Sequence, residues 1–101
     1  MEYDIKDDIL ELSNIENNEE KLLEIKDIIF NKKPKEIVFN LSKFENIDSS
    51  TVAAFLSIIK FNQDSKNESE IIYLNPPKTI EAKFSYVGLL DFGVVKRDSS
   101  T

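Results

Sequence analysis

The stretch that decides the fold is FENIDSSTVAAFL, residues 44–56. It follows the short apolar run IVFNL, residues 37–41, and becomes almost entirely apolar on one side. This pattern predicts a strand, a tight loop and a helix. Asp48, Ser49, Ser50 and Thr51 gather where the helix is expected to begin, and backbone N–H groups there lack intrahelical partners and carry a partial positive charge. Their oxygens have two alternative roles: they cap the helix, or they present an acceptor to another molecule.

The N-terminal residues predict a strand region that changes face. Tyr3 and Ile5 occupy odd positions, whereas Leu10 and Leu12 occupy even positions, so one regular strand would place the two pairs on opposite faces. A strand cannot change face without a turn or bulge, and the polar residues 6–8 suit such a break. We expect a short hairpin, or one strand with a bulge.

A first helix is predicted after the polar loop at residues 14–20. Asn17 or Asn18 can cap it, and Glu20 stands three residues after Asn17, as in a capping box. Apolar residues then recur at helical spacing, at Leu22, Ile25 and Ile29. The helix is expected to end near Asn31, because Pro34 cannot continue it.

Residues 37–41 and 71–74 are continuous apolar runs, typical of strands buried on both faces in a sheet with helices on it. A helix between them implies a right-handed parallel crossover. Val52, Phe55 (or Leu56) and Ile59 suffice for the core face of that helix. The remaining apolar residues are ordinary core or, alternatively, a docking face: Ala53, Ala54, Ile58 and Phe61.

The C-terminal third predicts one more helix and a short strand. Pro77 lies near the first turn of the helix, where a missing N–H costs nothing. Gly88 stands where a left-handed cap is expected, with Leu89 making the accompanying apolar contact. Residues 94–95 can add a last strand. The economical fold class is α/β: one domain, residues 1–101, with a mixed, mostly parallel sheet of four to five strands and helices packed on it. Residues 1–95 form its core, and residues 96–101 form a frayed tail.

Composition limits the partners. Hydrophobic residues make up 41% and charged residues 32% of the 101 residues, and the net charge is -6. This balance of hydrophobic and charged residues is typical of a folded soluble domain. The negative net charge argues against nucleic acid and anionic membrane surfaces as partners. The chain has no apolar run long enough for membrane insertion and no signal-peptide pattern, so we expect a cytoplasmic protein.

Composition also limits the chemistry. The chain has no His and no Cys, which excludes serine–histidine triads, thiol nucleophiles and the usual zinc sites. Its two glycines cannot form a phosphate-binding loop, and no acidic cluster has calcium-loop spacing. We therefore expect no catalytic residue, no metal site and no cofactor.

Residues 37–52, IVFNLSKFENIDSSTV, resemble the signature of the STAS domain, which is found in bacterial anti-sigma factor antagonists and in sulphate transporter tails. The family pattern is an apolar strand, Asn or Asp then Leu, an aromatic or apolar position, Asp-Ser-Ser and a helix. Residues 74–76 and 85–89 resemble the family's third helix and its ending. The resemblance covers the chain from about Tyr3 to Val95.

The resemblance implies a phosphorylation-switched binding protein, an anti-sigma factor antagonist that is not an enzyme. Ser49 corresponds to the serine phosphorylated by the anti-sigma factor, which is itself a serine kinase; Ser50 and Thr51 are second choices. The unphosphorylated form binds the anti-sigma factor and frees the sigma factor, and a serine phosphatase removes the phosphate. The expected partner-binding residues are Asp48, Ser49, Ser50, Thr51, Ala53 and Ala54. We expect a monomer when the protein is free.

Thr51 departs from the family pattern, because many members have Gly at this position. Its side chain occupies space that a docking kinase would approach. An alternative function is therefore a STAS subunit with a constitutive structural role, in a stress-signalling scaffold or a transporter complex. Local sequence alone favours Ser49 as a cap, whereas the resemblance favours a regulatory serine.

Overall fold

The five strands lie in the sheet in the order in which they occur in the chain. The computed structural model describes residues 1–98. The strands are β1 (Glu2–Lys6), β2 (Ile9–Ser13), β3 (Glu36–Asn40), β4 (Glu70–Leu74) and β5 (Val94–Lys96). β1 and β2 are antiparallel, and the three other neighbouring pairs are parallel. The expected mixed, mostly parallel sheet is confirmed, with five strands.

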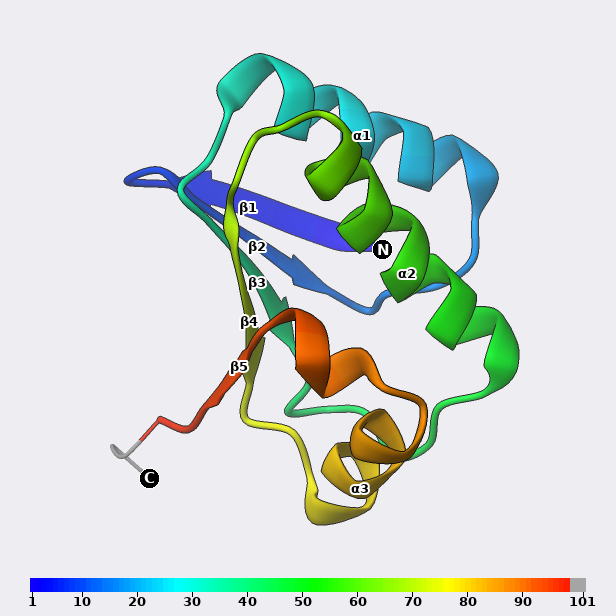
Figure 1. Ribbon diagram of the computed structural model, residues 1–101. Helices are drawn as coiled ribbons and strands as arrows, with labels where there is room; N and C mark the ends of the chain where they lie inside the picture. Colours follow the sequence, from blue (N-terminus) through cyan, green and yellow to red (C-terminus); the bar gives the residue numbers. More distant parts are fainter. Residues whose placement is uncertain (99–101) are drawn as a thin grey trace.

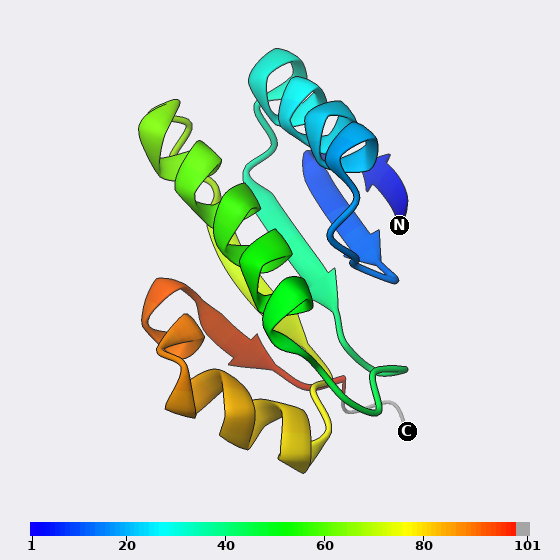
Figure 2. The ribbon, with the colours of Figure 1, turned by 90° about the vertical axis from the view of Figure 1, so that its right-hand side faces the viewer.

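The helices lie on one face of this sheet (Figures 1 and 2). They are α1 (Glu19–Lys32), α2 (Ser49–Asp64), α3 (Lys78–Tyr86) and the 3₁₀ helix η1 (Leu89–Phe92). Each parallel connection passes through helical structure: α1 joins β2 to β3, α2 joins β3 to β4, and α3 with η1 joins β4 to β5. The crossover β3–α2–β4 is thus parallel, as the sequence predicts.

The N-terminal hairpin is confirmed. Asp7 and Asp8 form its turn, with φ of 53° and 66°, and two successive positive φ angles are typical of the tight turns that join antiparallel strands. Ile5 then pairs with Leu10, so the parity change in the sequence is resolved by the turn.

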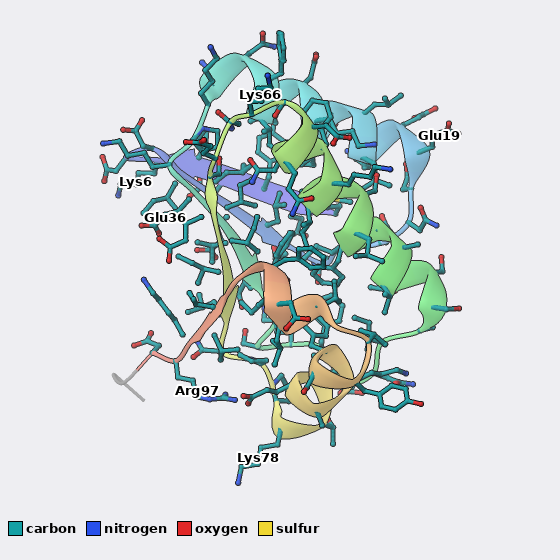
Figure 3. All side chains as sticks on the ribbon, in the orientation of Figure 1. Lys6, Glu19, Glu36, Lys66, Lys78 and Arg97 are labelled. Atoms are coloured by element: carbon teal, nitrogen blue, oxygen red, sulfur yellow. The ribbon has the colours of Figure 1, made fainter. Side chains whose placement is uncertain are left out.

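Central strands are buried on both faces, but the cover differs from the expectation. Val38 and Ile72 point away from the helices and are only 7% and 3% exposed. They stand side by side in the register, between Glu11 of β2 and Val94 of β5. Neighbouring strands therefore bury them. Lys6 and Glu36 also project from this helix-free face (Figure 3).

The core face of α2 contains the expected Phe55 and Ile59 and is wider than the minimal face predicted. Its buried residues are Ala54, Phe55, Ile58, Ile59 and Asn62. Ala54 and Ile58 have no exposed surface, so both belong to the core, whereas Val52 lies only partly inside it. The stripe is wide because α2 packs against the sheet and also alongside α1.

Of the two expected caps of α1, Asn18 is confirmed, whereas the capping box is wrong. Asn18 is the N-cap, and its Oδ1 accepts a hydrogen bond from the Lys21 N–H at 3.1 Å. The capping box expected between Asn17 and Glu20 is therefore absent from this helix start. At the other end, Lys33 adopts a left-handed φ of 48° and Pro34 follows.

The C-terminal segment is more ordered than expected. Gly88 has the expected left-handed φ of 83°, and Leu89 is fully buried. Lys96 belongs to β5, Arg97 donates to the Pro76 carbonyl at 2.6 Å, and the Asp98 N–H donates to Asn75 at 2.7 Å. Figure 3 shows Arg97 beside the start of α3. The expected tail is therefore wrong for residues 96–98, and residues 99–101 lie outside the described part.

Gly93 offers a test of how β4 and β5 fit together. A Cβ at this position would stand 2.5 Å from the Ile71 carbonyl oxygen and 2.8 Å from the Ile71 Cβ. We expect Gly93→Ala to reduce the free energy of unfolding by about 1–3 kcal/mol through overpacking, measured by thermal melting. The matched control is Gly88→Ala, where the nearest atom is 3.9 Å away and only the positive φ opposes the change. A melting temperature unchanged in Gly93→Ala would contradict this packing.

Candidate functional site

The loop between β3 and α2 is held at both ends. The Leu41 N–H donates to the Leu74 carbonyl at 2.9 Å, which ties the loop to β4. Asn40 Oδ1 accepts from the Ser42 N–H and the Ser42 hydroxyl, at 3.1 and 2.8 Å. Ile47 is 1% exposed and anchors the loop in the core immediately before the helix. The following residues, 48–51, therefore start α2 from a fixed point.

Asp48 is the N-cap of α2. Its Oδ1 accepts hydrogen bonds from the Thr51 N–H at 2.8 Å and from the Thr51 hydroxyl at 2.9 Å. The Asp48 carbonyl accepts from the Val52 N–H at 3.0 Å, the first hydrogen bond of the helix. Capping is thus performed by the carboxylate, and the alternative in which Ser49 caps the helix is wrong.

Ser49 is the first residue of α2, and its side chain is exposed. Within residues 1–98, no hydrogen bond involves the hydroxyl of Ser49 or that of Ser50. The Thr51 hydroxyl, in contrast, is bonded to Asp48, and its side chain is half-buried. The structure therefore leaves two serine hydroxyls uncommitted at the helix start.

The same cap lowers the pKa of the Asp48 carboxyl group. The main cause is the backbone N–H of Thr51, and the second is the Thr51 hydroxyl; partial desolvation opposes them. The charge of Lys83 adds a smaller lowering. Both Thr51 donors bind the charged form of Asp48 and stabilise it.

Lys83 is a member of this site that the sequence did not single out. Its Nζ donates a hydrogen bond to the Ile47 carbonyl, which links α3 to the loop before Asp48. The two residues are 36 positions apart, and Lys83 lies on the outer side of an ordinary amphipathic helix. Only the tertiary structure brings this cation to the start of α2.

The two alanines after the cap have different positions. Ala53 is exposed, one turn beyond Ser49, and remains available to a partner. Ala54 is 0% exposed because it faces the core, so the expectation that its side chain contacts a partner is wrong.

An open recess of about 530 Å³ lies beside the loop, at the ends of β2 and β3. Its lining includes Ser13, Asn40, Phe44 and Glu45.

Within the described residues, no group of three or more acidic side chains is arranged to hold a metal ion. None of the helices over the same residues is long and apolar enough to cross a membrane.

The fold and this helix start place the chain in a known family. The family model of the STAS domain matches residues 4–100, nearly the whole chain, and the protein therefore belongs to the STAS domain family. A comparison with curated protein sequences found no match.

Solved structures share the fold. The solution structure of the protein TM1081 has 27% sequence identity, a TM-score of 0.73, and covers 97% of this chain and 81% of its own. A crystal structure of TM1081 from Thermotoga maritima, provisionally assigned as an anti-sigma factor antagonist, has 24% identity and a TM-score of 0.69. The match covers 98% of this chain and 86% of the TM1081 chain. The anti-sigma factor antagonist SpoIIAA in its unphosphorylated form has 18% identity and a TM-score of 0.64. The match covers 98% of this chain and 88% of the SpoIIAA chain. This chain thus has the fold of anti-sigma factor antagonists.

The depressed pKa of Asp48 predicts a pH-dependent stability. A carboxyl group whose pKa is lower in the folded state stabilises the fold above its unfolded pKa, near 3.8, and loses this effect as the pH falls through the folded value. We expect wild type to melt at a higher temperature than Asp48→Asn at pH 7, and the difference to shrink below about pH 4.

Asp48→Ala is the matched control. It lacks both the charge and the cap, so it should melt below Asp48→Asn by an amount that does not change with pH. A constant difference between wild type and Asp48→Asn from pH 7 to pH 2.5 would contradict the assigned role of the carboxylate.

Proposed function

We propose that this protein is an anti-sigma factor antagonist that sequesters an anti-sigma factor of the serine-kinase type and is switched off by phosphorylation at Ser49. Its activity would regulate transcription that depends on a sigma factor. The single observation that carries the proposal is the exposed, uncommitted Ser49 hydroxyl on the first turn of α2, within the Asp-Ser-Ser element of a STAS domain. The protein has no catalytic role in this scheme, needs no cofactor, and acts in the cytoplasm.

The helix start favours a phosphate group at this position. Of the N–H groups in the first turn, that of Thr51 is capped by Asp48 and that of Val52 is bonded to the Asp48 carbonyl. Within the part of the chain that the structure describes, the N–H groups of Ser49 and Ser50 have no acceptor, so they stay available to an anion, and the helix dipole favours negative charge there. The Lys83 ammonium group reaches from α3 to the loop just before Asp48, where it donates to the Ile47 carbonyl. The fold therefore tolerates a phosphate on Ser49.

A complex with the anti-sigma factor docked on the helix start would not tolerate a phosphate on Ser49. Phosphorylation adds about -1.5 to -2 charges at neutral pH. A partner covering Asp48, Ser49, Ser50, Thr51 and Ala53 would desolvate this charge next to the Asp48 carboxylate, which is costly. The difference between an exposed phosphate and a buried one provides the switch, and a serine phosphatase would reset it.

Phosphorylation itself is the first test. We expect incubation with the partner kinase and ATP to modify the wild-type chain once, at Ser49, as mapped by mass spectrometry. Ser49→Ala should remain unmodified, whereas the matched control Ser50→Ala should be modified like wild type. A modified Ser49→Ala protein, or an unmodified wild type, would contradict the assignment of Ser49.

Binding to the anti-sigma factor is the second test, and it uses two substitutions of Ser49. Ser49→Asp should keep the melting temperature of wild type within a few degrees and should bind the anti-sigma factor at least about tenfold more weakly, a loss of about 1.4 kcal/mol. Ser49→Ala should bind like wild type.

Thr51 supports a second candidate function, a constitutive subunit of a larger signalling or transport assembly. Its side chain stands where many members of the family have Gly, so the helix start is bulkier, and its hydroxyl donates a hydrogen bond to Asp48. In that case the protein would copurify stably with the assembly, and Ser49→Asp would leave this association unchanged.

A further inference from the structure

The strand β1 forms an open edge of the sheet (Figure 2). It pairs with β2 along all five residues, and within residues 1–98 no strand lies on its outer side. Every second residue of an antiparallel strand directs its N–H and C=O groups away from the neighbour it pairs with. An edge of this kind is a template for another strand. β1 contains no proline and no bulge, so its protection against pairing is limited to its charged side chains, and these are compatible with a partner strand that carries complementary charges.

The sequence of β1 is self-complementary. Glu2, Asp4 and Lys6 lie on the helix-free face, and Tyr3 and Ile5 lie on the helix face. If two copies of β1 align antiparallel about Asp4, Glu2 of each copy faces Lys6 of the other, and Tyr3 faces Ile5. Opposite charges and an aromatic residue against a β-branched one are favourable cross-strand pairs. Tyr3 is 45% exposed, so it has surface to bury in such a pair.

The strand at the other edge of the sheet, β5, is not self-complementary. β5 has three residues, Val94, Val95 and Lys96. An antiparallel pairing of two copies about Val95 would set Val94 against Lys96, without charge complementarity. A parallel alignment of β1 with itself would set Glu2 against Glu2 and Lys6 against Lys6, which is unfavourable.

We propose that β1 is a homodimerisation edge: it pairs antiparallel with β1 of a second copy, centred on Asp4, and joins the two sheets into one. This replaces the expectation of a monomer in the free protein. The edge lies beyond β2, whereas α2 connects β3 and β4, so the dimer leaves the start of α2 exposed. The inference does not depend on Ser49 or on the identity of the anti-sigma factor.

The test uses charge reversal in the full chain. Sedimentation equilibrium from about 10 µM to about 1 mM covers the affinities of weak specific contacts. The apparent mass of wild type should rise from 11.6 kDa towards twice that value. Glu2→Lys and Lys6→Glu each turn two attractive pairs into repulsive ones, and each should weaken self-association about tenfold or more.

Two rescues follow from the same geometry. The double variant Glu2→Lys/Lys6→Glu restores both opposite-charge pairs, so it should dimerise like wild type. An equimolar mixture of the two single variants should associate more strongly than either variant alone, because Lys meets Glu at both positions. Asp4→Asn removes the one like-charge pair at the centre and should strengthen the dimer.

These side chains are exposed, and circular dichroism checks that each variant is folded. Three outcomes would overturn the proposal: wild type that stays at 11.6 kDa over the whole range, self-association that none of the substitutions alters, or single variants that the double change and the mixture fail to rescue. The second outcome would mean that another surface of the chain mediates the contact.

Discussion

The structure depends on the side chain of Phe55, which holds α2 against the sheet and against α3. Its ring lies 4.9 Å from the ring of Phe39 on β3 and 5.2 Å from that of Phe84 on α3, both in edge-to-face geometry. Phe84 in turn contacts Tyr73 on β4, whose hydroxyl donates to the buried Leu89 carbonyl at 2.7 Å. Edge-to-face aromatic pairs are favourable beyond the area they bury. Two strands and two helices thus share one aromatic cluster.

This cluster explains why a polar helix start can be both exposed and well defined. Phe55 lies six residues after Ser49 on the same helix, so the packing of its ring fixes the first turns of α2 without any contact from the serine. Asp48 closes the turn through Thr51, and Lys83 braces the preceding loop through Ile47. Since capping and core packing are carried by other residues, the Ser49 hydroxyl is left available for chemistry.

Local sequence patterns were sufficient for most of the fold, and they failed where tertiary contacts decide. The parity change around Asp7 and the left-handed Gly88 follow from backbone preferences, which act locally. The burial of Ala54 and of Asn62 depends on α2 packing against several elements at once, which periodicity within one helix cannot show. Lys83 reaches the site from a distant helix, so no spacing rule could have found it.

We expect a phosphate on Ser49 to change the surface of the helix start and to leave the core in place. Comparing ¹H–¹⁵N NMR spectra of the unmodified and the Ser49-phosphorylated protein tests it most directly. Large shift changes should be confined to residues 47–52 and the neighbourhood of Lys83, with the amides of β3 and β4 and of Phe55 unchanged. Changes spread through the strands and the aromatic cluster would show that the phosphate disrupts the fold, which would contradict this expectation.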